Sequence, residues 1–282
     1  MVTGPNASRV RQSSVLGRAG ARFFYSSIAE FLFTNAWYSL VAKLDKHADE
    51  PFMNYGFAQL DGGQLALESR LEPHRYAIQL YDHVAANGAV QGKDLLEIGC
   101  GRGGGASYLA AALQPRRYVG LDINKSAVAC NRRLYRDQPN LEFIAGDAHA
   151  LPFGDATFGV ALNVESSHHY RDLDTFLGEV HRVLVPGGTF LMACFPRRNE
   201  LALREPLARS AFACVFEEDI TANVVRALEI DSGRREAAVD RLCPAPLRTF
   251  AREFAGVRGS ELYDSFASGR RRYLNFVLRK TA

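Results

Sequence analysis

Cysteine is scarce in this chain of 282 residues, and its five copies follow no metal-binding or disulfide pattern. No C-x-x-C pair occurs, and the spacing is irregular: Cys100, Cys130, Cys194, Cys214 and Cys243. Disulfide-rich secreted domains and zinc modules need regularly spaced cysteines. We therefore predict no disulfide framework and no metal site. Free thiols are typical of a reducing compartment, so we expect a cytoplasmic location.

The chain also lacks a strong excess of either charge. Its 34 Lys and Arg residues and 31 Asp and Glu residues give a formal net charge of +3. The basic residues are scattered, and we interpret the one tight run, Arg270-Arg271-Arg272, as a solvated turn. A nucleic-acid-binding surface usually carries a dense basic stripe with interleaved aromatic residues. None is present in the sequence, so we expect no nucleic-acid partner.

No hydrophobic run is uninterrupted enough to predict stable membrane insertion. In the most apolar stretch, residues 22–44, Ser26, Glu30 and Thr34 recur at the spacing of one helix face. We predict an amphipathic helix there, within an N-terminal arm and lid at residues 1–70. The helix would pack on the core or cover an apolar substrate, and a homodimer face or a peripheral membrane contact are alternatives.

Glycine, in contrast, is concentrated in one place. An apolar run without helical period at 94–98 stops at Gly99, Gly101 and Gly103–Gly105, and small and apolar residues at helical spacing follow. This predicts a strand, a tight loop and a helix. Glycines without a Cβ allow positive φ and a close approach to a ligand. The helix amino-terminus that opens on the loop favours an anionic group.

The spacing Gly99-x-Gly101-x-x-Gly104 also matches the dinucleotide-binding fingerprint, with Asp122 about 20 residues further on. Taken alone, it leaves a nicotinamide or flavin enzyme and a purely structural turn open. Glu97 directly before the loop changes the interpretation, because a carboxylate repels a pyrophosphate but suits a cationic aminoacyl group. The ligand that combines a ribose, an adenine and a positive amine is S-adenosyl-L-methionine. We expect the loop, including Cys100 and Gly103, to bind it.

The rest of the chain alternates between short apolar runs and helical patterns. Runs at 118–122, 141–147, 158–163 and 189–194 are strand-like, and 71–86, 126–135 and 173–184 are helix-like. This predicts an α/β, Rossmann-like, seven-stranded and mostly parallel sheet covered on both faces. We divide the chain further into a cofactor-binding core at 71–196, a helical cap insertion at 197–256 and a C-terminal β-hairpin at 257–282. The hairpin strands are predicted at 261–266 and 273–278.

Several polar residues follow the predicted strands at the edge where such sheets bind ligands. Asp122 offers two acceptor oxygens to the two ribose hydroxyls. Asp147 and the Ala148 N–H offer an acceptor and a donor to the adenine edge. A strand-end Asp is also a common helix cap, which is the alternative for each alone. The remaining predicted cofactor contacts are Tyr55, in an aromatic segment suited to cover the ligand, Ile123 and Asn163.

Four separated motifs resemble the class I S-adenosylmethionine-dependent methyltransferases. They are Leu-Leu-Glu-Ile-Gly-Cys-Gly-Arg-Gly at 95–103, Gly-Leu-Asp at 120–122, Gly-Asp-Ala-His-Ala-Leu-Pro-Phe at 146–153 and Val-Leu-Val-Pro-Gly-Gly at 183–188. The motifs stand in family order, and the resemblance covers about residues 71–282. The segments at 52–56, 103–108 and 164–170 are similar to the branch that methylates hydroxyls of polyketide-derived lipids and other natural products, such as the phthiotriolone methyltransferases of mycobacteria. Gly159 departs from the family, which commonly has Asp there.

This resemblance implies methyl transfer to a hydroxyl of a fairly apolar small molecule, without a metal. The hydroxyl must lose a proton, and a histidine with a pKa near the working pH is the usual base. His168 and His169 follow the fourth predicted strand, so one of them is the expected base, and plain packing is the alternative. Glu165 would hold the acceptor or orient the histidine. N- or C-methylation and a cyclase on the same fold remain open. Methylation of RNA is disfavoured, because the segment after the fourth predicted strand lacks the Asn/Asp-Pro-Pro-aromatic motif that clamps a flipped base.

Overall fold

The computed structural model describes residues 37, 40–41, 44–45, 49–196 and 199–281. It divides into two units, residues 1–40 and 41–282. All helices and strands given below belong to the second unit. The predicted lid helix at 22–44 lies almost entirely outside the described residues, so it stays a prediction.

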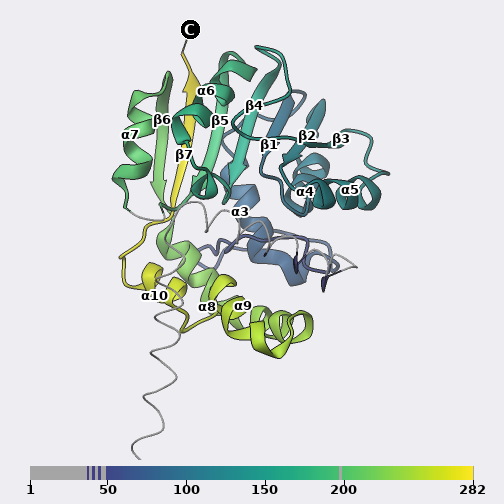
Figure 1. Ribbon diagram of the computed structural model, residues 1–282, viewed down its shortest axis with the longest axis vertical. Coiled ribbons are helices and arrows are strands. Elements are labelled where there is room, and N and C mark those ends of the chain that lie inside the picture. The colour runs from purple at the N-terminus through teal and green to yellow at the C-terminus, as the bar shows by residue number, and fades with distance from the viewer. Residues whose placement is uncertain (1–36, 38–39, 42–43, 46–48, 197–198, 282) are drawn as a thin grey trace, which may run out of the picture. The chain divides into compact units, whose positions relative to one another are not determined.

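A seven-stranded sheet organises residues 41–282 in the order β3-β2-β1-β4-β5-β7-β6 (Figure 1). Neighbouring strands from β3 to β5 are parallel, whereas β7 runs antiparallel between β5 and β6. The predicted α/β class and mostly parallel sheet are therefore confirmed. The strand order reverses at β1, which is where open α/β sheets bind ligands. The strands are β1 (Asp94–Ile98), β2 (Arg117–Asp122), β3 (Leu141–Ala145), β4 (Phe158–Val164), β5 (Leu184–Cys194), β6 (Phe212–Asp219) and β7 (Leu274–Lys280).

Helices cover both faces of this sheet. Buried side chains of α3, α4, α5, α8 and α10 join the apolar cluster on one face, and those of α6 and α7 join the cluster on the other. Figure 1 shows α8, α9 and α10 grouped beyond the end of the sheet where β4 and β5 finish. The helices are α3 (Arg75–Ala85), α4 (Gly104–Ala112), α5 (Lys125–Leu134), α6 (Leu173–Val183), α7 (Leu201–Arg209), α8 (Thr221–Leu242), α9 (Arg248–Phe254) and α10 (Glu261–Ala267). Short 3-10 turns are η1 (Glu72–His74), η2 (Ser167–His169) and η3 (Ala245–Leu247).

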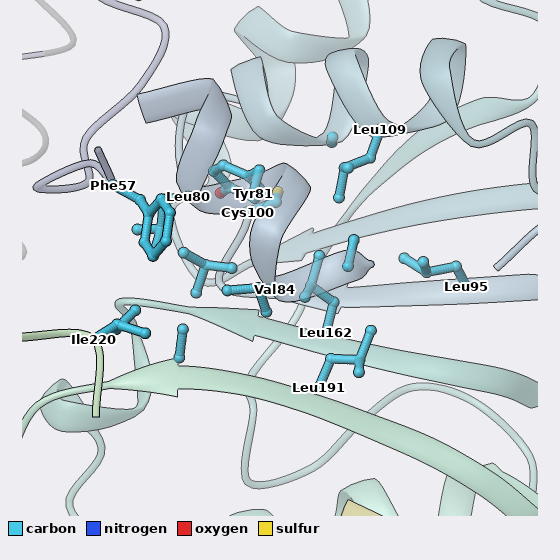
Figure 2. Close-up of a cluster of buried hydrophobic side chains, with 14 of the residues drawn as sticks. Phe57, Leu80, Tyr81, Val84, Leu95, Cys100, Leu109, Leu162, Leu191 and Ile220 are labelled. Carbon is cyan, nitrogen blue, oxygen red and sulfur yellow. The ribbon is translucent and has the colours of Figure 1, made fainter. Parts of the chain in front are cut away.

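The interior strand β1 is buried on both faces, which explains why its sequence has no alternation. Leu95 belongs to the cluster on one face and Leu96 to the cluster on the other, and both are fully buried. A strand with helices on both sides needs apolar residues in both directions. Figure 2 shows part of the first cluster, with Leu80 and Val84 of α3 near Leu162 of β4 and Leu191 of β5.

Close packing requires glycine at the start of α4. A Cβ on Gly104 would lie 2.6 Å from the Pro51 carbonyl oxygen, and a Cβ on Gly105 would collide with the Tyr81 ring. The Gly104 N–H donates to that Pro51 oxygen at 3.2 Å. The lead-in segment thus satisfies one of the helix donors that we expected to face an anion.

The predicted C-terminal hairpin is wrong in its first strand. Residues 261–266 lie in α10, whose amino-terminus is capped by Ser260, because its Oγ accepts a hydrogen bond from the Tyr263 N–H at 3.1 Å. Leu262 and Phe266 stand one helical turn apart, a spacing that competes with the strand-like reading. The predicted strand at 273–278 is confirmed as β7.

The antiparallel partner of β7 on the sheet edge is β6, which falls inside the predicted helical cap at 197–256. The expectation of an entirely helical insertion is therefore wrong. Most β6 residues are exposed, and the register shifts between Cys214 and Phe216. An exposed, bulged edge strand has little hydrophobic alternation to reveal it. In addition, β5 begins at Leu184, five residues before the strand-like run predicted at 189–194.

The packing at α4 predicts the effect of adding one methyl group. Gly105→Ala should lower the free energy of unfolding by about 2–3 kcal/mol, because the new Cβ overpacks the Tyr81 ring. Gly178→Ala in α6 is the matched control, since its Cβ would meet nothing within 4 Å. Alanine there should be neutral or stabilise by up to about 1 kcal/mol. Urea unfolding measures both, and equal effects would contradict the packing explanation.

Candidate site at the carboxyl ends of the strands

The loop between β1 and α4 is packed on one side and open on the other. Gly99, Gly101 and Gly103 have φ of +80°, +52° and +77°. A Cβ on Gly99 would collide with Ser166, whereas a Cβ on Gly101 would meet nothing within 4 Å. The structure therefore leaves an open approach to the backbone at Gly101, as expected for a ligand-binding glycine.

Asp122 ends β2 beside this opening. Its Oδ2 accepts a hydrogen bond from the Gly101 N–H and its Oδ1 one from the Asn124 N–H, both at 2.8 Å. Burial raises the pKa of Asp122, although these two hydrogen bonds oppose the shift. Each carboxylate oxygen can accept more than one bond, so capacity remains for a ribose. Ile123 is an apolar side chain 47% exposed at the same edge.

Asp147 follows β3 at this edge. Its Oδ1 accepts hydrogen bonds from the backbone N–H of His149 at 2.9 Å and from the His149 ring at 2.8 Å. Burial alone would raise the pKa of Asp147, but the bonds from His149 outweigh it and the pKa is lowered. The carboxylate is therefore ionised at neutral pH, and the residue is also partly exposed. Ala148 is buried.

Glu97 is not exposed at the site. It is fully buried, where Oε1 accepts a hydrogen bond from Tyr81 at 2.8 Å and Oε2 one from Tyr118 at 2.9 Å. Burial raises its pKa to about 7, although both hydrogen bonds oppose the shift. Glu97 thus joins α3 and β2 to β1. Cys100 is also buried, which raises the pKa of its thiol.

Asn163 is likewise engaged inside the protein. Its Nδ2 donates to the Ile98 carbonyl at 2.9 Å and to Ser166 Oγ at 2.7 Å, and its Oδ1 accepts from the Ser167 N–H at 3.1 Å. The side chain ties the loop after β4 to the end of β1. It positions the site through these contacts and is completely buried.

Glu165 joins three distant segments. Its Oε1 accepts hydrogen bonds from the Tyr55 N–H at 2.7 Å and the Tyr273 hydroxyl at 2.8 Å. Its φ is +51°, a conformation uncommon for a residue with a side chain and often found at functional sites. Burial raises its pKa to about 7. Tyr55 Oη in turn donates to the Phe254 carbonyl at 3.3 Å, so the predicted covering segment is tied to β4 and α9.

His168 and His169 lie together in η2 with ring centroids 4.1 Å apart. The His168 ring also packs on Phe195 at 4.1 Å. Burial lowers the pKa of His168 well below its usual range, aided by the charges of His169 and Arg271, and lowers that of His169 to about 4. The expected pKa near the working pH is therefore wrong for both rings, which are neutral at pH 7. His168 Nδ1 is buried without a hydrogen-bond partner in the described part of the chain.

An aromatic cluster beside these histidines escaped the sequence analysis. Phe195 contacts Tyr55, Phe266 and Tyr273 with centroid distances of 5.6, 5.4 and 5.7 Å. Phe195 directly follows β5, so its place at the carboxyl edge was a usable signal. Tyr273 precedes β7, and an antiparallel strand starts at the edge where the parallel strands end. The position of Tyr273 could not be predicted without knowing that β7 runs antiparallel to β5, which brings its start to this edge.

Metal ligation finds no support among the described residues, which contain no group of three or more His, Cys, Asp or Glu that could hold a metal ion. A separate observation concerns membranes. None of the helices built from residues 49–196 and 199–281 is long and apolar enough to cross a bilayer.

The fold, with the glycine loop and Asp122 at the carboxyl ends of the strands, is that of a class I S-adenosylmethionine-dependent methyltransferase, and the comparisons agree. Residues 96–192 match a family model described as a methyltransferase domain. The chain is 38% identical over 271 residues to the phthiotriol/phenolphthiotriol dimycocerosates methyltransferase of Mycobacterium tuberculosis, covering 96% of this chain and 98% of that one. It therefore belongs to this methyltransferase family.

Two further proteins are similar. The fatty-acid O-methyltransferase of Mycolicibacterium smegmatis is 42% identical over 215 residues, covering 76% of this chain and 78% of that one. The crystal structure of the cyclase SpnF superimposes with a TM-score of 0.67 at 23% identity, covering 88% and 95% of the two chains. At that identity the likeness concerns the fold alone.

The burial of Glu97 predicts a pH-dependent stability. Its folded pKa of about 7 lies above its ordinary value of 4.5, so the native state holds the proton more tightly. The contribution of protonated Glu97 to the free energy of unfolding is fully present below about pH 4.5 and is lost as the pH rises through about 7. Glu97→Gln keeps partners for both tyrosines and should reduce this loss by up to about 3 kcal/mol. Urea unfolding at several pH values measures it, with exposed Glu205→Gln as control; equal pH slopes for Glu97→Gln and wild type would contradict the assignment.

Proposed function

We propose that this protein transfers the methyl group of S-adenosyl-L-methionine to a hydroxyl oxygen of a fairly apolar acceptor. The observation that carries the proposal is one sheet edge holding both halves of such a site. The open glycine loop and Asp122 form one half, and the neutral histidine pair with its aromatic neighbours forms the other. The relatives add support, since one is named for O-methylation of a fatty acid and the other for phthiotriol dimycocerosates.

The residues present fit the cofactor. The backbone at Gly101 is open, Asp122 has spare acceptor capacity, and Ile123 offers an exposed apolar face. Asp122 would hold the ribose, Ile123 would contact the adenine, and Asp147 with the Ala148 N–H would read the adenine edge. Tyr55 would cover the site. When bound, the cofactor supplies a methyl group on a sulfonium, which keeps the bonding electron pair as the methyl leaves.

The chain's own contribution is positioning and proton transfer. Holding the reacting atoms in line can be worth about 7–11 kcal/mol. His168 and His169 are neutral because burial lowers their pKa values, so a ring nitrogen is free of its second proton and can take the one that the hydroxyl loses. The buried Nδ1 of His168 without a partner in the described residues is the best placed of these nitrogens.

The aromatic cluster supports an apolar acceptor. Phe195, Phe266 and Tyr273 are almost completely buried and contact one another. Phe195 also packs on the His168 ring, and Tyr273 donates a hydrogen bond to Glu165 directly after β4. A hydrocarbon chain against such rings would leave water. The fold shared with a cyclase does not favour cyclisation, because the relatives at 38% and 42% identity are both named methyltransferases.

Asp122 should control cofactor affinity. Asp122→Ala removes the ribose acceptor and should weaken S-adenosylhomocysteine binding by about 1–3 kcal/mol in titration calorimetry. Asp137→Ala, an exposed aspartate in a turn, is the control and should bind normally. NADH should give no binding signal with any of the three proteins. Undiminished binding by Asp122→Ala, or binding of NADH alone, would contradict the cofactor assignment.

The histidine base makes a prediction about rate and pH. His168→Ala or His169→Ala should lower turnover at least about 100-fold with unchanged S-adenosylhomocysteine affinity, whereas His181→Ala, on α6 against Phe212, should be active. With His169 as the base, kcat/KM should stay level from neutral pH down to about pH 5 and fall toward about 4.

A different base would give a different profile. If Glu165 took the proton, kcat/KM would rise with pH through about 7, and Glu165→Gln would abolish that limb. Full turnover in both single histidine variants would rule out the histidine base.

A further inference from the structure

Three consecutive arginines before β7 behave differently from one another. The Arg270 guanidinium pairs with Glu261 at 2.8 Å. Arg272 pairs with Asp219 at 2.7 Å and with Glu200 at 3.2 Å. Arg271 makes no ion pair and no side-chain hydrogen bond within the described residues, although its backbone N–H donates to the Ser265 carbonyl at 2.9 Å. The run follows the turn after α10, and its middle member differs from its neighbours in having no acidic partner among the described residues.

Arg271 points to the aromatic cluster. Its Cζ lies 5.5 Å from the centroid of the Phe195 ring and 5.9 Å from that of Phe266. These rings are 5.4 Å apart and nearly perpendicular. Since Phe195 also packs on His168, the guanidinium and the proposed base share one aromatic neighbour. Arg271 is thus part of the surroundings of the proposed acceptor.

The described residues offer the guanidinium no hydrogen-bond acceptor, and its nitrogens are not buried, so they face solvent. It carries five N–H donors in a planar fork, and contact with the aromatic faces satisfies its charge only partly. The side chain is half-buried, so less water is available to it than to Arg270. The buried carboxylate of Glu165 does not pair with Arg271, because it accepts hydrogen bonds from Tyr55 and Tyr273. An anionic group from outside the described chain would replace this water and supply the guanidinium with acceptors.

We propose that Arg271 is a specificity-determining residue that pairs with a carboxylate on the acceptor. The proposal rests on the proposed O-methyl transfer and adds the chemical class of the acceptor, an apolar chain that carries an acid near the reacting oxygen. The guanidinium fork matches a carboxylate in a bidentate arrangement, which a lysine ammonium does not reproduce. The aromatic cluster would hold the hydrocarbon while Arg271 holds its charged end.

Matched acceptors test this directly. The full chain is assayed with S-adenosyl-L-methionine and β-hydroxydecanoic acid, its primary amide, or decanoic acid. The hydroxy acid and the amide share the chain and the hydroxyl and differ in charge. Wild type should prefer the acid by about 10- to 100-fold in kcat/KM, mainly through KM. Arg271→Met should bring this ratio close to one by losing activity on the acid alone, and Arg271→Lys should keep part of the preference.

Arg270→Met and Arg272→Met are the matched controls and should keep the wild-type preference, because their side chains pair with acids elsewhere. S-adenosylhomocysteine binding verifies that each variant is folded. A wild type that uses acid and amide equally, or an Arg271→Met that loses both equally, overturns the role of Arg271 while the proposed methyl transfer stands. No methylation of any of the three acceptors by a wild type that binds S-adenosylhomocysteine counts against both proposals. Arg271-dependent methylation of decanoic acid supports the carboxylate contact and moves the reacting oxygen from a hydroxyl to the acid.

Discussion

The site depends on the loop between β1 and α4, which must be tightly packed on one side and open to a ligand on the other. Three of its glycines leave no room for a Cβ: Gly99 lies against Ser166, Gly104 against the Pro51 carbonyl and Gly105 against the Tyr81 ring. These contacts fix the loop, so that Gly101 can present an open backbone and donate to Asp122. Glycine is therefore needed twice over, for close packing within the protein and for access from outside.

Burial then sets the chemistry around that loop. It raises the pKa values of Glu97 and Glu165 to about 7 and lowers that of His169 to about 4. All three shifts favour neutral side chains at neutral pH. Burial therefore lowers the amount of fixed charge around the loop at neutral pH. Asp122 and Asp147 lie outside this neutral region, at the predicted ribose and adenine positions.

Much of the site was predictable because it follows the strand ends of a regular βα pattern. The glycine loop, Asp122 and Asp147 stand at the carboxyl edge as expected, and the α/β class is confirmed. The roles of Glu97 and Asn163 were not predictable, since the sequence does not say that Tyr81, Tyr118 and Ser166 fold back to meet them. The histidine pKa values depend on burial by segments far along the chain, which no local pattern reports.

The C-terminal third was harder to predict for a related reason. The helix α10 and the edge strand β6 carry short, ambiguous patterns, and tertiary packing decides between helix and strand there. The same region supplies Arg271 and Tyr273, which come just before the antiparallel strand β7 and contact Phe195 and Glu165. The residues proposed to select the acceptor thus come from the part of the chain with the weakest sequence signals.

The most direct test of the account follows the methyl group itself. The protein is incubated with S-adenosyl-L-methionine carrying a carbon-13 methyl group and with β-hydroxydecanoic acid, and the product is examined by NMR. The account predicts that the label appears as a methyl group on oxygen, with one S-adenosylhomocysteine formed for each methyl transferred. Label on carbon or nitrogen, or a bound cofactor that keeps its methyl group in the presence of the acceptor, would contradict it.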